Sequence, residues 1–146
     1  MANVEITNHY ADVEKALQAA MDKAAMMCGM VAETAAKQSL TASGAVDTGY
    51  LRNSVTFGIG GKPPHISQYS GKGKKGKPAR TGGYGGSLPA DSDPDERTVY
   101  VGTNVEYAPE IEFGTSRMAA RPFIRTAFSD NLGKVEAAVR KAFQST

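Results

Sequence analysis

Carboxylates are the first residues in this sequence whose type and spacing suggest chemistry. Asp47, Thr48 and Gly49 form the Asp-Thr-Gly triplet of aspartic proteases, in which two carboxylates share one proton and activate water. That chemistry needs a strand-rich frame. Here a long helical pattern precedes the triplet, and the helix-like segment Tyr50–Asn53 follows it. We therefore expect Asp47 or Thr48 to cap the following helical turn rather than to act in catalysis.

A second group of carboxylates consists of Glu106, Glu110 and Glu112. Paired carboxylates can act as general acid and general base. Glu106 and Glu110 are four residues apart, however, and so share one face of a helix that is more often solvated or turned toward a neighbouring subunit. A carboxylate hydrolase remains an alternative that would need activity dependent on Asp47 or Glu112, but we expect no enzyme.

The sequence predicts no metal, cofactor or phosphate site. His9 and His65 are too far apart to have the spacing of zinc ligands. Gly71–Lys77 is rich in Gly and Lys, but no hydrophobic strand precedes it, no Ser or Thr follows a Gly-Lys pair, and no helix follows. Cys28 is the only cysteine and lies among Ala and Met, so we expect a small buried apolar side chain and no intramolecular disulfide.

Length and composition favour one globular domain over residues 1–146. The chain is 40% hydrophobic and 22% charged, and its net charge of +2 is too small to argue for nucleic acid by itself. We see no secretion signal and no apolar run long enough to cross a bilayer. We therefore expect a protein that is made in the cytoplasm.

Hydrophobic periodicity predicts two long amphipathic helices, which would position the candidate residues. The first covers about residues 9–40, with a stripe of Val13, Leu17, Ala20, Ala24, Met27 or Cys28, Val31 and Ala35. The second runs from about Arg121 to Gln144, with Pro122 in its first turn and a stripe of Ile124, Phe128, Leu132, Val135, Val139 and Phe143. Both stripes should face a core. For the first helix, flanked by Met26 and Met30, a second apolar contact with a neighbouring subunit is the alternative.

Alternating residues predict two antiparallel strands, Ser54–Gly60 and Arg97–Asn104, and a short strand is also indicated at Val4–Ile6. After the second strand we expect a short helix started by Pro109 and ended at Gly114. The fold class is thus α+β: a long N-terminal helix and a C-terminal helix packed on a small antiparallel sheet.

Between the two strands, residues 61–96 form a Gly-, Lys- and Pro-rich stretch that we expect to be an extended, unpacked loop. Its first half is basic, through Lys72, Lys74, Lys75, Lys77 and Arg80, and its end is acidic. The basic half could contact DNA phosphates without sequence preference, contact a protein neighbour, or be only a solvated tip.

Two stretches together resemble a known family. VDTGYLRNSV is similar to the Val-Asp-Thr-Gly-x-Leu-Arg-x-Ser signature of bacteriophage head–tail joining, or tail-completion, proteins of long-tailed phages. YVGTNVEYAPEIEFGTSRMAARPFIRTAF resembles the second signature, which runs from Val-Gly through Tyr-Ala and Glu-x-Gly-Thr to Pro-Phe-x-Arg. Thr126 stands where this family usually has Pro. The resemblance covers nearly the whole chain except residues 61–96.

The resemblance implies a structural virion protein that forms a ring in the phage neck, between the head-closing and tail-terminator proteins and around the DNA channel. Six copies are expected, with twelve as the alternative beside a portal. The implied motif or subunit-interface residues are Asp47, Thr48, Gly49, Leu51, Arg52, Ser54, Tyr107, Ala108, Glu110, Glu112, Gly114, Thr115, Arg121, Pro122 and Phe123. The alternative function is a nucleic-acid-binding accessory protein that uses the basic loop.

Four arginines in the two signatures are candidate partners for the glutamates of the second one. Guanidinium groups bind carboxylates through two parallel hydrogen bonds. We expect Arg52, Arg117, Arg121 and Arg125 to pair with Glu106, Glu110 or Glu112, either within one subunit or across a ring interface.

Overall fold

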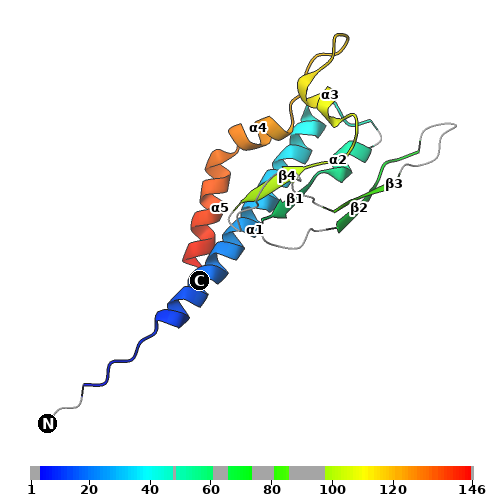
Figure 1. Ribbon diagram of the computed structural model, residues 1–146. Helices are drawn as coiled ribbons and strands as arrows, with labels where there is room; N and C mark the ends of the chain where they lie inside the picture. Colours follow the sequence, from blue (N-terminus) through cyan, green and yellow to red (C-terminus); the bar gives the residue numbers. More distant parts are fainter. Residues whose placement is uncertain (1–3, 48, 61–65, 74–80, 86–97, 146) are drawn as a thin grey trace.

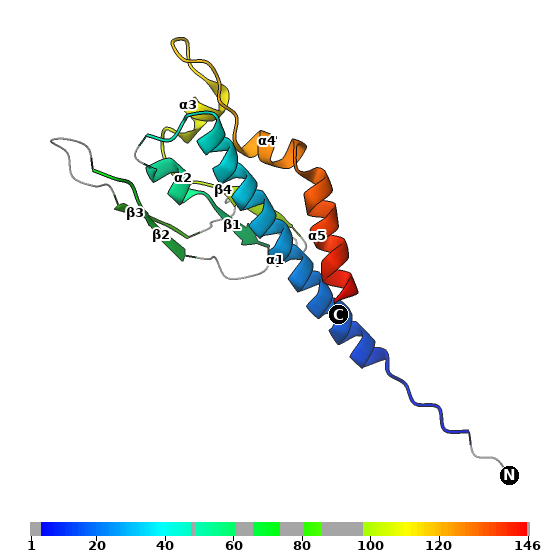
Figure 2. The ribbon, with the colours of Figure 1, turned by 180° about the vertical axis from the view of Figure 1, so that it is seen from behind.

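The computed structural model describes residues 4–47, 49–60, 66–73, 81–85 and 98–145. These residues form an α+β fold built around the 33-residue helix α1 (Tyr10–Ala42). Figure 1 shows α1 as a central rod, with the small sheets on one side and the C-terminal helices on the other, and Figure 2 shows the same arrangement from behind. Within the described part of the chain, no helix is both long and apolar enough to cross a membrane.

Two short antiparallel sheets lie beside α1. Strand β1 (Thr56–Ile59) pairs with β4 (Val99–Gly102), with Thr56 opposite Gly102 and Ile59 opposite Val99. This pairing confirms the predicted hairpin. The one-turn helix α2 (Tyr50–Ser54) leads into β1, and α3 (Ala108–Phe113) follows β4, with Pro109 in its first turn as predicted.

The predicted C-terminal helix is two helices, α4 (Ile124–Ser129) and α5 (Leu132–Gln144). The Asn131 side chain donates a hydrogen bond to the carbonyl of Ala127 at 3.1 Å and so satisfies a backbone acceptor at the end of α4. Helix α5 then turns back along α1. The prediction of a strand at Val4–Ile6 is also wrong: the segment has no strand partner among the described residues, and both apolar side chains are exposed.

Residues 61–96, predicted to be a loop, contain strands β2 (Ile66–Ser70) and β3 (Thr81–Gly85), which pair with each other. Tyr69 in β2 is buried against Tyr50, with ring centroids 5.0 Å apart, and its hydroxyl donates a hydrogen bond to Asn104. The amide of Asn53 donates to the carbonyl of Ser70 at 2.7 Å. The loop prediction is therefore wrong for these strands, because one tyrosine and a few hydrogen bonds secure a segment whose composition looked too polar to pack.

The core lies where α1 meets α2, the start of α4 and the segment after β4. Its fully covered side chains include Leu40, Val55 and Phe123. The α1 side of the core is mostly alanine, which lets the partners approach closely. At Gly29 the approach is closest, because a Cβ atom there would lie 2.1 Å from the ring of Phe57.

The predicted apolar stripes are only partly buried. Ala20, Ala24 and Ala35 of the first stripe face the core, but Val13 and Leu17 are exposed. In the last two helices Phe128, Leu132 and Phe143 are also exposed, whereas the small residues Ala138 and Ala142 are the ones buried in α5. Along these two stripes, burial therefore follows the close approach of small side chains, and several larger apolar residues stay exposed.

Candidate functional site

A buried carboxylate joins α3 to α4. Glu112 is only 8% exposed, and its Oε2 accepts hydrogen bonds from the backbone N–H groups of Phe123 at 2.8 Å and Ile124 at 3.1 Å. Its Oε1 accepts a third from the N–H of Arg125 at 3.1 Å. These donors stand at the start of α4, where backbone N–H groups lack acceptors within the helix and a negative charge is favourable. Glu112 thus fixes the position of α4 relative to α3.

This role differs from the predicted pairing with arginine. Across the described residues, no ion pair joins Arg52, Arg117, Arg121 or Arg125 to Glu110 or Glu112. Arg121 instead donates from its side chain to the carbonyl of Gly44 and from its backbone to the carbonyl of Ile111, at 3.3 and 2.7 Å. The predicted pairing within one chain is therefore wrong for Glu110 and Glu112, and pairing between subunits stays a prediction.

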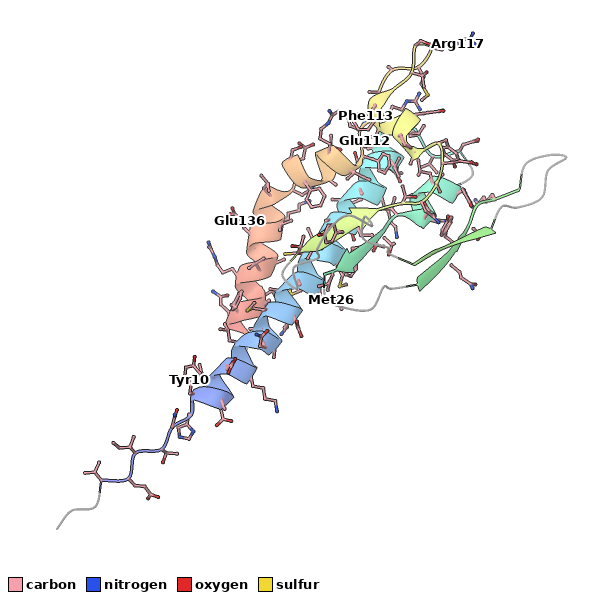
Figure 3. The ribbon with its side chains drawn as sticks, in the orientation of Figure 1. Tyr10, Met26, Glu112, Phe113, Arg117 and Glu136 are labelled. Carbon is pink, nitrogen blue, oxygen red and sulfur yellow. The ribbon has the colours of Figure 1, made fainter. Side chains whose placement is uncertain are left out.

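Gly114 ends α3 and starts a projecting loop over residues 114–121. Its φ of +75° is a conformation that glycine adopts readily, and a Cβ atom there would lie 2.7 Å from the backbone nitrogen of Ala120. Thr115 and Met118 exchange backbone hydrogen bonds across the loop, at 2.8 and 3.3 Å. Figure 3 shows Arg117 at the far tip of the loop, away from the body of the molecule. The predicted break after α3 is confirmed.

An apolar groove lies between α3 and α4, and we call it the α3–α4 groove. Its volume is about 550 Å³, which falls in the range of pockets that bind small ligands or side chains. The end of β4, α3 and the start of α4 contribute its lining, which consists of Gly102, Thr103, Asn104, Val105, Ala108, Pro109, Glu112, Phe113, Phe123, Ile124 and Arg125. Phe113 is 72% exposed, although it lines the groove. The groove is therefore suited to bind an apolar partner.

The first signature, VDTGYLRNSV, packs next to the α3–α4 groove. Gly49, with a φ of +81°, is the N-cap residue of α2, so Asp47 does not take the predicted capping position; Thr48 lies outside the described residues. Ser54 is fully buried, donates to the carbonyl of Leu51 at 2.6 Å and is hydrogen-bonded to Thr103. Thr103 also lines the α3–α4 groove, so the structure brings the two signatures into contact.

The predicted motif residues fall into two groups. Leu51, Ser54, Ala108, Glu112 and Phe123 are buried and stabilise the chain itself. The remaining described residues are exposed or half-buried, namely Asp47, Gly49, Arg52, Tyr107, Glu110, Gly114, Thr115, Arg121 and Pro122. Lys72 is exposed, while Lys74, Lys75, Lys77 and Arg80 lie outside the described residues.

Two sets of exposed apolar residues were missed by sequence reasoning. One is Phe113, which is 72% exposed at the last position of α3. The other is the start of α1, where Tyr10, Val13 and Leu17 are 74%, 64% and 52% exposed. Their helical spacing was visible in the sequence, but the sequence did not show that this stripe would extend beyond the part of α1 that α5 covers.

Neither the cysteine nor the acidic residues suggest a metal centre. Cys28 is half-buried, and desolvation raises the pKa of its thiol, which disfavours the reactive thiolate. In the part of the chain that the structure describes, no group of three or more His, Cys, Asp or Glu side chains could hold a metal ion.

Comparison of the chain with protein-family models, with curated proteins and with solved structures gave no match. The function is therefore inferred from the residues and the geometry of the chain.

Proposed function

We propose that this chain is a structural protein of the bacteriophage neck that forms a ring, joins the DNA-filled head to the tail and surrounds the DNA channel. The two sequence signatures, in order and at suitable separation, support this assignment, as does the α+β fold in which they come into contact. Six copies per ring remain the expected number, with head-completion and tail-terminator or tail-tube proteins as neighbours.

The structural observation that carries the proposal is a pair of unlike apolar surfaces. One is the stripe of Tyr10, Val13 and Leu17 at the start of α1, and the other is the α3–α4 groove near the opposite end of that helix. Contiguous exposed apolar surface marks an interaction site more often than a solvated face. A ring needs two different complementary surfaces on each subunit, because its contacts are heterologous.

The test is made in a phage or prophage that encodes the chain. Removal of the chain should leave DNA-filled heads and separate tails, visible by electron microscopy, and infectious yield should fall sharply. Supplying the intact chain from a plasmid should restore joined particles. Normal joined particles in the absence of the chain would refute the proposal.

The alternative is a nucleic-acid-binding accessory protein that uses Lys72, Lys74, Lys75, Lys77 and Arg80. The two functions differ in their salt dependence. Neutralising about four phosphate-contacting lysines should flatten a plot of log affinity against log salt concentration by roughly three to four units. Tight DNA binding by the purified chain, with a salt dependence that becomes weaker when the lysines are neutralised, would favour the alternative. Salt-insensitive or negligible binding would favour the structural role.

A further inference from the structure

We propose that the first two turns of α1 in one copy dock into the α3–α4 groove of the next copy, with Tyr10, Val13 and Leu17 as the anchoring side chains. The inference deepens the proposed ring and rests on it for the choice of a second copy as partner. It assigns the two surfaces that would form each subunit contact.

The docking segment has the spacing of a helix that binds in a groove. Tyr10, Val13 and Leu17 stand at positions i, i+3 and i+7, which is the anchor pattern of amphipathic helices in such complexes. Their stripe continues the one that α5 covers from Ala20 onward. Helix α5 ends at Gln144, and Lys23 donates to the hydroxyl of the next residue, Ser145, at 2.5 Å. Figure 1 shows α1 continuing alone past this point.

The receiving groove is apolar and already formed. Val105, Ala108, Phe123 and Ile124 contribute apolar lining, and Phe113 presents an exposed ring. Glu112 fixes the distance between the two helices that line it. A helix could therefore bury its anchors there without first separating α3 from α4.

The docking segment is acidic, and the groove offers it one exposed cation, Arg125. The segment before Gln18 carries Glu5, Asp12 and Glu14 against Lys15 as its only Lys or Arg. In the groove, the charged lining residues are Glu112 and Arg125, and the Glu112 carboxylate already accepts three backbone N–H groups. Arg125 is exposed and thus free to attract an acidic segment. Opposite charges at the rim favour docking in one orientation.

The docking segment must come from a second copy. The groove lies at the end of α1 where Leu40 and Phe123 belong to one buried cluster, and Val13 is about 40 Å from Leu40 along the same helix at 1.5 Å per residue. Because α1 is continuous from Tyr10 to Ala42, it cannot fold back on the groove of its own chain. Repetition of this contact makes a ring when the rotation between copies closes.

Site-directed cross-linking of the full chain tests the proposal. In a Cys28→Ser background, Val13→Cys and Phe113→Cys variants are co-expressed with tags of different length and treated with a short bis-maleimide. We expect a cross-linked heterodimer of the two variants. The matched control pairs Val13→Cys with Glu136→Cys, because Figure 3 shows Glu136 on the outer side of α5, away from α1 and the groove. That pair should give only background product.

A second variant checks that the anchors cause the contact. Adding Leu17→Glu to the Val13→Cys chain should reduce the heterodimer to the control level while circular dichroism shows unchanged helix content, since Leu17 is already 52% exposed. Equal product from the Phe113 and Glu136 pairs, no product from either, or product that survives Leu17→Glu would each overturn the docking. These readouts use the purified chain and do not depend on particle assembly. If the chain gives no such cross-link but is still required for joined particles, the docking is refuted and the neck function stands.

Discussion

The two ends of α1 share one helical pattern and have opposite environments. From Ala20 to Leu40 the core-facing side chains are buried under α4, α5 and the sheet formed by β1 and β4. From Tyr10 to Leu17 the same periodicity presents larger apolar side chains to solvent. Apart from Leu40, the buried residues of the covered end are alanine and glycine, whereas the uncovered end carries Tyr, Val and Leu. The larger side chains thus occur where the described residues provide no cover, which is the pattern expected of a contact made with another molecule.

The sharpest way to test this comparison is to make the same substitution at both ends. Leu40→Ala removes a side chain that is fully buried, and we expect it to lower the free energy of unfolding by about 3 kcal/mol, as cavity-forming substitutions do. Leu17→Ala should change it by no more than about 0.5 kcal/mol in the monomer. Urea denaturation measures both, and similar losses at the two ends would show that the start of α1 is covered after all.

The stability of the covered end also depends on the position of α4, which Glu112 holds through three hydrogen bonds. We expect Glu112→Ala to lower the free energy of unfolding by about 2 kcal/mol, because three backbone donors lose a charged acceptor. Glu110→Ala removes the same group from an exposed position on the same helix and should have little effect. If the two variants melt at the same temperature, the carboxylate of Glu112 does not stabilise the α3–α4 contact.

A glycine-to-alanine pair tests whether close approach defines the covered end. Gly29→Ala would place a Cβ atom 2.1 Å from the Phe57 ring, so the gain in helix propensity is outweighed and we expect a net loss of about 1 kcal/mol. Gly133→Ala in α5 meets no atom within 4 Å, and we expect it to stabilise the protein by about 0.5 kcal/mol. Thermal unfolding should shift in opposite directions, and a stabilising Gly29→Ala would contradict the tight packing on Phe57.

The smallest expected effect is on the alkylation rate of the Cys28 thiol. Because burial raises the pKa of the Cys28 thiol, less of it is thiolate at neutral pH, and its alkylation should be slow and should keep rising at pH values above the usual thiol range. A cysteine placed at Val13 in a Cys28→Ser background should react faster at pH 7. Stopped-flow alkylation compares the two, and equal rate profiles would mean that the two ends of α1 do not differ in solvation.

Local patterns in the sequence predicted the elements better than their contacts. The periodicity of α1, the alternation of β1 and β4, and the Pro109 and Gly114 limits of α3 were sufficient to place those elements. Hydrophobic spacing could not show that α5 stops beside Lys23, because the length of one helix does not determine where its partner ends. Nor did it show the break between α4 and α5, where the Asn131 side chain donates a hydrogen bond to the carbonyl of Ala127.

The candidate site was predicted in part. The signatures selected Glu112, Gly114 and Phe123, which together build the groove and its adjoining loop. The role of Glu112 could not be read from its spacing, because its three partners are backbone groups brought close only by the turn after Gly114. Strands β2 and β3 were missed for a similar reason: Tyr69 is a single aromatic in a polar stretch, and its burial depends on Tyr50 in a distant segment.

The hydrogen bonds of Glu112 would affect the rate of the proposed docking between copies. Because three hydrogen bonds hold α3 and α4 together before any partner arrives, little conformational entropy needs to be lost on the groove side when a complex forms. The association rate should then be limited by orientation and by charge at the rim, and should fall as salt is added. A chain with Glu112→Gln, which keeps only one strong acceptor oxygen, would have to order the groove during each encounter and should associate more slowly even where its final contacts are unchanged.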